Sequence, residues 1–205
     1  MIPDPIFRAK GSEAEQRALM EALVQEIGFG LIFAQTPNGP RVGQVALYST
    51  GDGAMKFHLA RANALTKSLA GTDAVIVVSG PDAYVSPDWY DRPDQVPTWN
   101  YISIELEGPV RALGQEGLIG LLDDLAAVNE AKLAPKAPWT RDKMDDAKFH
   151  KMLGGITGFE MEVMAWRPTL KLSQNKTEDE RLRVADELEK LGKKAIAHFM
   201  RELVK

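Results

Sequence analysis

The chain has 205 residues, of which 44% are hydrophobic and 26% charged, a length and composition typical of one globular domain with a sizeable core. It contains no cysteine, which excludes disulfide frameworks, thiolate zinc sites and cysteine nucleophiles. Its net charge of −4 disfavours broad, sequence-independent binding to nucleic acid. The sequence shows neither a leader segment nor an apolar stretch of about 18 residues, so we expect a cytoplasmic protein without a membrane span.

The first part of the chain predicts a helix followed by an antiparallel hairpin. Ser12 and Glu15 have the spacing of a capping box, and apolar residues then recur at helical intervals up to Ile27. The segments FGLIFAQT and RVGQVALY flank Asn38-Gly39, a dipeptide that favours tight turns between paired strands. We therefore expect these two segments to pair as a hairpin.

Strands and a helical insertion follow in the middle of the chain. Residues 54–60 alternate between apolar and polar side chains, whereas residues 73–80 contain an unbroken apolar run from Ala74 to Val78, as in a strand covered on both faces. After a strand that begins near residue 99, leucines at helical spacing predict a helical insertion at about 114–155. Residues 159–166 then alternate again and predict a further strand.

The last element is a predicted C-terminal helix at about 177–204. Thr177 and Glu180 form a second capping box at its start, and Gly192 is a weak point within it. Together, about six strands with mostly short connections predict an α+β protein, a closed or nearly closed antiparallel β-barrel with peripheral helices. We expect a single domain over residues 1–205.

Strand alternation separates the aromatic residues of the segment VPTWNY from an aliphatic row. Asn100 falls in line with Ile102 and Ile104, whereas Trp99 and Tyr101 point to the other face. If the aliphatic row lines the barrel interior, the two aromatic side chains lie on the outer wall and need cover from a helix, a second subunit or a ligand. For Asn100, an amide that bonds a ligand and a buried amide that ties down a neighbouring loop are equally good interpretations.

Two polar segments supply candidate binding residues. They are Arg61, Asn63, Thr66 and Lys67 in HLARANALTK, and Lys171, Ser173, Gln174 and Asn175 in KLSQNK. A solvated turn at a strand end would also explain the first segment, and helix capping would explain part of the second. The three histidines show no spacing typical of metal ligands, so we predict no metal site, and the sequence identifies no catalytic residue.

Five segments, in this order and spacing, resemble the PaiB family, described as FMN-binding negative transcriptional regulators. They are HLARAN at 58–63, GPDAYVSPDWY at 80–90, VPTWNY at 96–101, GFE at 158–160 and KLSQNK at 171–176. The resemblance covers nearly the whole chain and implies an FMN-binding split β-barrel, in which two subunits form a homodimer with FMN at the interface. It also implies two activities, negative regulation of transcription and flavin redox chemistry. A cofactor-free dimeric interaction module and a flavin reductase or oxidase without a regulatory role are the alternatives.

The resemblance also implies roles for the candidate residues. Those in HLARANALTK would bind the FMN phosphate, those in KLSQNK would contact the flavin, and Trp99 and Asn100 would flank the ring and bond its edge. The chain departs from the family pattern at Ala64, where proline is usual, and at Asp82, where we expect histidine. Thr169-Leu170 also stands where an aromatic residue is more usual. An aspartate near the flavin would repel its anionic reduced form.

The sequence gives no indication of direct DNA binding. It contains no convincing helix-turn-helix, and the C-terminal helix interleaves Arg181, Arg183, Lys193 and Lys194 with glutamates. This pattern is typical of a solvated helix surface rather than of a basic stripe, and it leaves both direct DNA binding and indirect regulation open.

Overall fold

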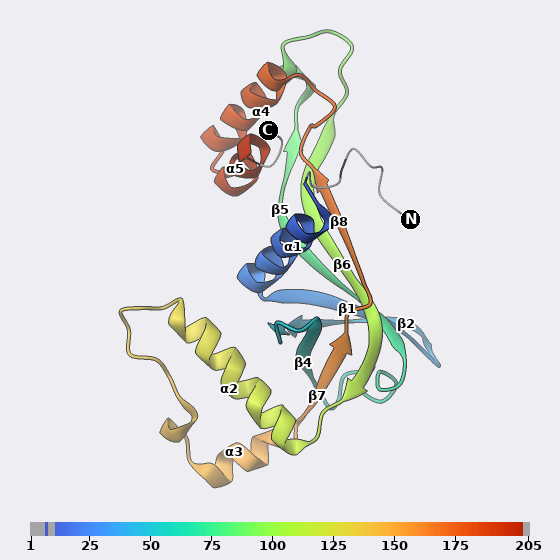
Figure 1. The fold of residues 1–205 in the computed structure, drawn as a ribbon, viewed down its shortest axis with the longest axis vertical. Coiled ribbons are helices and arrows are strands. Elements are labelled where there is room, and N and C mark those ends of the chain that lie inside the picture. Colours follow the sequence, from blue (N-terminus) through green and yellow to red (C-terminus); the bar gives the residue numbers. More distant parts are fainter. Residues whose placement is uncertain (1–6, 8–10, 203–205) are drawn as a thin grey trace. The chain divides into compact units, whose positions relative to one another are not determined.

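The computed structural model describes residue 7 and residues 11–202, and its elements are labelled in Figure 1. The helices are α1 (Glu13–Ile27), α2 (Gln115–Ala131), α3 (Asp146–Leu153), α4 (Glu178–Lys190) and α5 (Lys194–Glu202), with short 3-10 helices η2 (Pro87–Tyr90) and η3 (Arg141–Lys143). The strands are β1 (Phe29–Thr36), β2 (Gly39–Ala46), β3 (Tyr48–Ser49), β4 (Ala54–Ala60), β5 (Asp73–Val85), β6 (Thr98–Ala112), β7 (Ile156–Glu162) and β8 (Ala165–Lys171). Within the described part of the chain, no helix is both long enough and apolar enough to cross a bilayer.

The strands form one 8-stranded sheet in the order β2-β1-β5-β6-β7-β4-β3, with β8 paired to β6. About six strands are expected from the sequence. The difference arises because the segment RVGQVALY divides into β2 and β3, and because β8 begins directly after β7 and continues to Lys171. β5 also continues beyond Gly80 to Val85, through the Gly-Pro pair that resembles the end of a strand.

The chain groups into two compact units, which we describe separately. The described residues of unit 1 fall within 1–23, 79–104 and 167–205, and those of unit 2 within 24–78 and 105–166. Because β5 and β6 each begin in one unit and end in the other, neither unit is a continuous piece of sequence. The single domain expected from the sequence stays a prediction.

In unit 2, the predicted hairpin is confirmed, because β1 pairs with β2 in a register that runs from Phe29 opposite Ala46 to Thr36 opposite Gly39. The Thr36 hydroxyl closes the turn by donating to the carbonyl of Gly39 at 2.7 Å. The alternation expected in β4 is also confirmed, since Met55, Phe57 and Leu59 are all buried. Phe57 stacks on Phe159 of β7, its register partner, with ring centroids 5.7 Å apart.

The helical insertion predicted at about 114–155 is present in unit 2 as α2, η3 and α3. Leu118 of α2 packs with Phe149 and Leu153 of α3 in a small core cluster. Gly158 allows α2 to pack closely on β7, because a Cβ atom there would lie 3.1 Å from Leu118 Cδ1 and that side chain would have to shift. This packing places α2 and α3 next to β4 and β7.

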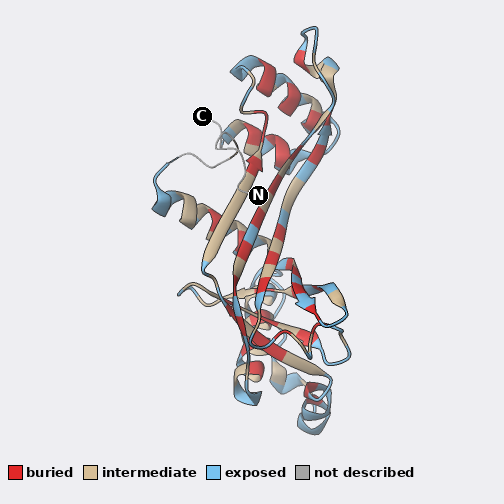
Figure 2. Ribbon diagram, turned by 90° about the vertical axis from the view of Figure 1, so that its right-hand side faces the viewer, coloured by how far each residue is buried: buried red, intermediate tan, exposed pale blue. Residues whose placement is uncertain are grey.

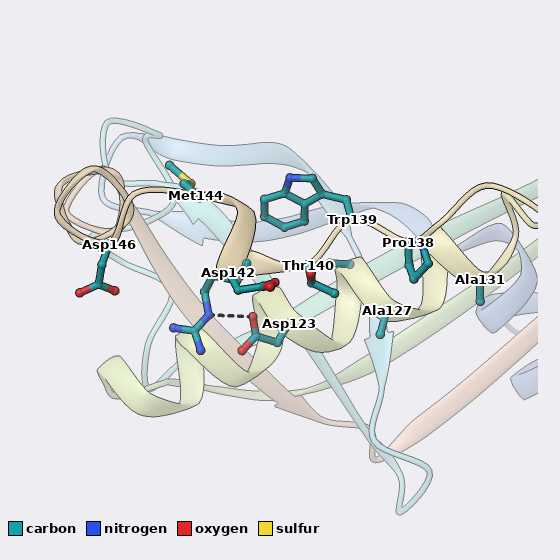
Figure 3. Close-up of a pocket in the computed structure, with 11 residues that line it drawn as sticks. Asp123, Ala127, Ala131, Pro138, Trp139, Thr140, Asp142, Met144 and Asp146 are labelled. Carbon is teal, nitrogen blue, oxygen red and sulfur yellow. Dashed lines mark ion pairs between the residues drawn. The ribbon is translucent and has the colours of Figure 1, made fainter.

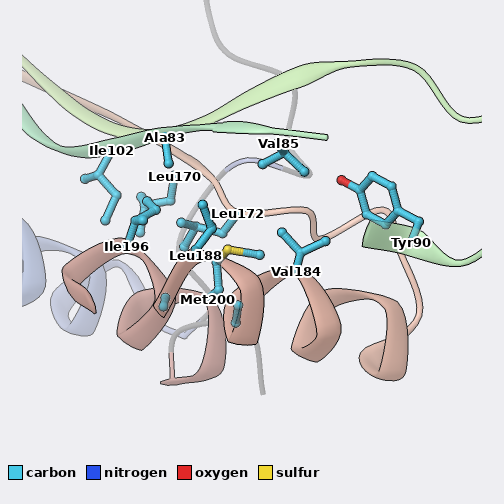
Figure 4. Close-up of a cluster of buried hydrophobic side chains, with 12 residues drawn as sticks. Ala83, Val85, Tyr90, Ile102, Leu170, Leu172, Val184, Leu188, Ile196 and Met200 are labelled. Carbon is cyan, nitrogen blue, oxygen red and sulfur yellow. The ribbon is translucent and has the colours of Figure 1, made fainter. Parts of the chain in front are cut away.

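Unit 1 has its own core, in which α4 and α5 pack against parts of β5, β6 and β8 (Figure 4). The buried side chains are Ala83, Val85, Tyr90, Ile102, Leu170, Leu172, Val184, Ala185, Leu188, Ile196, Ala197 and Met200. Alternation of buried and exposed residues along the long strands is visible in Figure 2. The core of unit 1 therefore combines residues from the middle of the sequence with residues from its C-terminal part.

The single C-terminal helix expected at about 177–204 is wrong in one respect: the segment forms two helices, α4 and α5. The break falls at Gly192, which has a φ of 77°, a conformation that glycine adopts without steric cost. The predicted start is confirmed, because Thr177 and Glu180 form a complete capping box. The predicted residues 203–204 lie outside the described residues.

Candidate functional site

The turn that follows β4 in unit 2 is held in one conformation by its own polar groups. Asn63 Oδ1 accepts a hydrogen bond from the backbone N–H of Leu65 at 2.9 Å, and the Thr66 hydroxyl donates to the carbonyl of Ala60 at 2.8 Å. Leu65 and Leu69 are fully buried and attach the turn to the core. Because its proton is already donated, the Thr66 hydroxyl cannot also donate to a phosphate oxygen, so its role here is to shape the turn.

Two cations on this turn keep most of their hydrogen-bonding capacity. Arg61 is exposed, and of its five N–H donors only one makes a bond in the described structure, a long one of 3.4 Å from Nη2 to the carbonyl of Ile156. Lys67 is exposed and makes no ion pair or hydrogen bond with any described residue. The turn therefore presents two cations with free donors, which is the donor set that a phosphate group requires.

The polar residues between β8 and α4 in unit 1 are used differently. Lys171 Nζ donates to the Thr98 hydroxyl at 2.7 Å. The Gln174 side chain accepts from the backbone N–H of Leu172 at 2.7 Å and donates to the carbonyl of Leu170. These bonds fix the backbone where the strand turns into the helix, and among the four candidates of this segment only Asn175 is exposed.

A buried hydrogen-bonded network lies beneath this segment. Asn100 is 0% exposed, and its Nδ2 lies 3.0 Å from Ser173 Oγ and 3.4 Å from Met200 Sδ. The hydroxyl of Tyr90 lies 3.1 Å from the same Ser173 oxygen, and burial raises the pKa of Tyr90. Ser173 adopts a φ of 62°, a left-handed conformation that is unfavourable for residues other than glycine. The hydrogen-bonded network holds Ser173 in this conformation. In this structure the Asn100 amide ties down a neighbouring loop.

Trp99 lies on the opposite face of β6 from Asn100, as the alternation predicts. Its side chain is 50% exposed, and its Nε1–H donates to Asp82 Oδ1 at 3.0 Å. The ring of Tyr84 meets it edge-on, with centroids 6.0 Å apart. The ring of Trp99 is therefore available to a partner, whereas its N–H is occupied by Asp82, the residue that departs from the family pattern.

The structure brings together the four candidates of the β4 turn and, separately, joins Asn100 to Ser173. Sequence reasoning did not find the bonding roles of Tyr90, Thr98 and Met200, because partners so far apart in sequence leave no periodic signal. Two of these residues do fall inside segments that carry the family resemblance, which is the signal that could have drawn attention to them.

Many solved structures share this fold, and two illustrate the likeness. The FAD and heme binding protein from Mycobacterium smegmatis superposes with a TM-score of 0.59 over 85% of this chain and 78% of that chain, at 18% identity. The flavocytochrome Anf3 from Azotobacter vinelandii gives a TM-score of 0.52 over 82% of this chain and 75% of that chain, at 16% identity. These likenesses confirm the fold class predicted from the sequence, an α+β split β-barrel.

Two sequence comparisons give the family. The "Protease synthase and sporulation protein PAI 2" of Bacillus subtilis (strain 168) is 29% identical over 195 residues, which cover 89% of this chain and 90% of that protein. The family described as "Putative FMN-binding domain" matches residues 7–165, well over half of the chain. The resemblance to the PaiB family is thereby confirmed: the chain belongs to this FMN-binding family, whose cofactor is FMN.

Proposed function

We propose that this protein binds FMN and that Arg61 and Lys67 hold the phosphate group on the turn after β4. The observation that carries the proposal is the pair of exposed cations with free donors on a turn whose shape is fixed by Asn63 and Thr66. Hydrogen bonds between charged partners are roughly twice as strong as neutral ones, and a rigid turn loses little conformational entropy when the ligand binds.

For the flavin ring, we propose contacts from the outer face of β6 and from the segment after β8. Trp99 offers a flat, half-exposed surface, and Lys171 keeps two N–H donors beyond the one given to Thr98. Asn175 is exposed and has an amide free to bond a polar ring edge. When bound, FMN supplies the redox chemistry, and these residues would bind and orient it.

We propose further that the protein is a homodimer with FMN at its interface. The outer face of β1 and β2 exposes Phe29 (53%), Phe33 (40%) and Val42 (49%), and Phe33 lies directly opposite both Val42 and Val75 of β5. β5, expected to be covered on both faces, leaves Val75 only partly buried. A contiguous apolar sheet surface of this kind is typical of a protein interface, and a second copy of the chain would cover it.

The cofactor proposal is tested by measuring flavin in the purified protein, by absorbance and by mass after denaturation, and by titrating stripped protein with FMN and with riboflavin. FMN is expected to bind roughly a hundredfold more tightly than riboflavin, because riboflavin lacks the phosphate that two cations would bond. A colourless protein that takes up no added FMN would contradict the proposal. Equal affinities for the two flavins would contradict the phosphate site.

The dimer proposal is tested by the molar mass in solution of the wild type and of Phe33→Asp. The wild type is expected at twice the chain mass, and the variant as a monomer, because a carboxylate would be buried without a partner. Met164→Asp, at an exposed apolar residue outside this sheet face, is the matched control and should stay dimeric. A monomeric wild type would refute the proposal.

The proposal also includes two activities, flavin redox chemistry and a role in gene regulation. Flavin redox activity would appear as reduction of protein-bound FMN by NADPH in the absence of oxygen. A role in gene regulation would be indirect, because Arg181 of α4 is buried and donates to the carbonyl of Met200 at 3.0 Å, and Arg183 donates to the carbonyl of Tyr90 at 3.1 Å. A salt-sensitive shift of one specific DNA fragment at sub-micromolar protein would overturn the indirect role.

A further inference from the structure

Unit 2 contains two neighbouring pockets in its helical insertion, and none of the ten residues predicted to bind FMN lines either of them. The first, about 850 Å³ in volume, lies between α2 and the segment from Pro138 to Asp146 (Figure 3). The second, about 350 Å³, lies between α2, α3, β4 and the start of β7, and we call it the His58 pocket. Four residues contribute to both pockets: Asp123, Trp139, Arg141 and Met144.

The walls of the His58 pocket are suited to a flat, apolar molecule. Aromatic rings come from Trp139 and Phe149, and thioethers come from Met144 and Met152, whose sulfur atoms make favourable contacts with aromatic rings. A volume of this size is at the lower end of the roughly 300–1,000 Å³ typical of small-molecule sites. The lining therefore favours a planar ring system of one or two rings.

The charged groups of the pocket neutralise each other. Arg141 Nε lies 3.2 Å from Asp123 Oδ1, and the guanidinium lies 5.1 Å from the centroid of the Phe149 ring. Because this ion pair and this ring contact already compensate the Arg141 charge, the pocket does not call for a charged ligand. A neutral ligand suits it better.

One polar group of the pocket has no partner. His58 lies on the face of β4 opposite the core, and its Nδ1 is buried without a hydrogen bond to any described residue. Burial lowers the pKa of His58, so the ring is neutral near pH 7 and carries one donor and one acceptor nitrogen. A polar atom buried without a partner is destabilising, and a hydrogen bond from a ligand to the imidazole would offset that cost.

We propose that the His58 pocket binds a planar aromatic molecule of one or two rings, whose hydroxyl group hydrogen-bonds the His58 imidazole. A hydroxyl both donates and accepts, so it matches the imidazole whichever nitrogen carries the proton. The pocket would be a second small-molecule site in the FMN-binding chain, separate from the residues proposed to hold FMN.

The experiment compares 2-naphthol with 2-methylnaphthalene, which has the same shape but no hydroxyl, on the full chain in excess FMN. The readout is the NMR signal of 13C-labelled methionine methyl groups, assigned with Met→Leu variants. Met144 and Met152 are expected to shift, whereas Met20 and Met200, buried elsewhere, should not. Because the hydroxyl adds one neutral hydrogen bond, 2-naphthol should bind about fivefold more tightly than 2-methylnaphthalene.

Variants locate the contact. His58→Leu should remove the fivefold difference and leave 2-methylnaphthalene unaffected, whereas His150→Leu, at the half-exposed histidine of α3 outside this pocket, should change neither. Leu122→Trp should fill the pocket and abolish binding of both compounds.

Three results would overturn the proposal. They are no shift of Met144 or Met152 at millimolar ligand with or without FMN, equal binding of the two compounds by the wild type, and binding of the naphthol to flavin-stripped protein that excess FMN abolishes. The first two do not depend on His58→Leu, so they decide the matter even if that variant fails to fold. The third would assign the pocket to the flavin site, whereas failure of FMN to bind at all would refute the proposed function and leave this proposal standing.

Discussion

The turn after β4 and the junction between β8 and α4 are both short, polar and rich in cations and amides, yet the structure uses them in opposite ways. In the turn, the groups that shape the backbone are neutral, and the cations Arg61 and Lys67 keep free donors. At the junction, Ser173 and Gln174 use their hydrogen-bonding capacity within the chain. A polar motif is therefore a candidate for ligand binding only to the extent that its donors and acceptors are not already used by the fold.

The strongest test of this contrast is Asn100→Ala. The change removes the amide that bonds Ser173 and Met200 at a fully buried position, and it leaves a cavity. We expect the free energy of unfolding to fall by about 3 kcal/mol, measured by urea denaturation. Trp99→Ala, at the adjacent but half-exposed residue, is the control and should cost much less.

The same variant can also show that the contrast between the turn and the junction is wrong. If Asn100→Ala kept the stability of the wild type and lost affinity for FMN, the amide would belong to the binding site rather than to the fold. The buried network would then have to open when the ligand binds.

The complementary change is Lys67→Ala on the turn. Loss of one charged hydrogen bond to the phosphate should weaken FMN binding by about 2 kcal/mol, roughly thirtyfold, and leave both riboflavin binding and stability unchanged. Fluorescence titration with the two flavins measures this. Lys56→Ala is the matched control, because this lysine of β4 lies 3.9 Å from Glu160 and away from the turn.

Lys171→Ala gives the contrasting pattern within the same assay. Lys171 is proposed to contact the ring, which FMN and riboflavin share, so its loss should weaken both flavins equally. If Lys171→Ala affected FMN alone, the phosphate would lie at the junction between β8 and α4, and the assignment of the two segments would be reversed.

The features that can be predicted from the sequence are those that follow from short-range periodicity. The alternation that separates Trp99 from Asn100, the hairpin at Asn38-Gly39 and the capping box at Thr177 all depend on residues within a few positions of each other. The sequence predicts Gly192 only as a weak point of one helix. In the structure its N–H donates to the carbonyl of Glu189 and the N–H of Lys193 donates to that of Leu188, a local motif with positive φ that ends α4.

The internal bonding of Ser173 could not be predicted in the same way. Its partners are Tyr90 and Asn100, and Asn100 in turn donates to Met200 Sδ, so the network joins residues from separate parts of the sequence. The family resemblance identified Ser173 as a cofactor contact, and only the structure reveals that its hydroxyl is buried among other side chains. Resemblance gives the segment that matters, whereas burial and hydrogen bonds indicate what each residue in it can do.

A smaller effect is expected from Thr177→Ala, immediately after the polar segment. The Thr177 hydroxyl is part of the capping box that begins α4, so its loss should cost about 1 kcal/mol of unfolding free energy. Flavin affinity should not change. Ser12→Ala removes the corresponding hydroxyl from the start of α1. Urea denaturation of the two variants compares how much each cap contributes to the free energy of unfolding, and the Thr177 cap, which begins a helix of the unit 1 core, is expected to contribute more.

The smallest expected effect concerns Glu180 and how the free energy of unfolding changes at acidic pH. Its side chain accepts from the Thr177 hydroxyl at 2.7 Å and from the Thr177 backbone N–H at 2.8 Å, and it lies 3.2 Å from Arg92 Nε. The Thr177 hydroxyl above all lowers the pKa of Glu180 from its ordinary value of 4.5. As pH falls below 4.5, the unfolded chain takes up a proton at this position before the folded chain does, so stability present above that pH is lost.

Glu180→Gln should therefore be less stable than the wild type at pH 7 and should lose less further stability when the pH falls below 4.5. Urea denaturation at a series of pH values measures both. Glu178→Gln is the matched control, because it removes the same charge from an exposed position in the same helical turn and should keep the wild-type slope. If the two variants had the same slope, the Glu180 carboxylate would contribute no more than a solvated surface charge, and the junction between β8 and α4 would be less committed to the fold than its hydrogen bonds indicate.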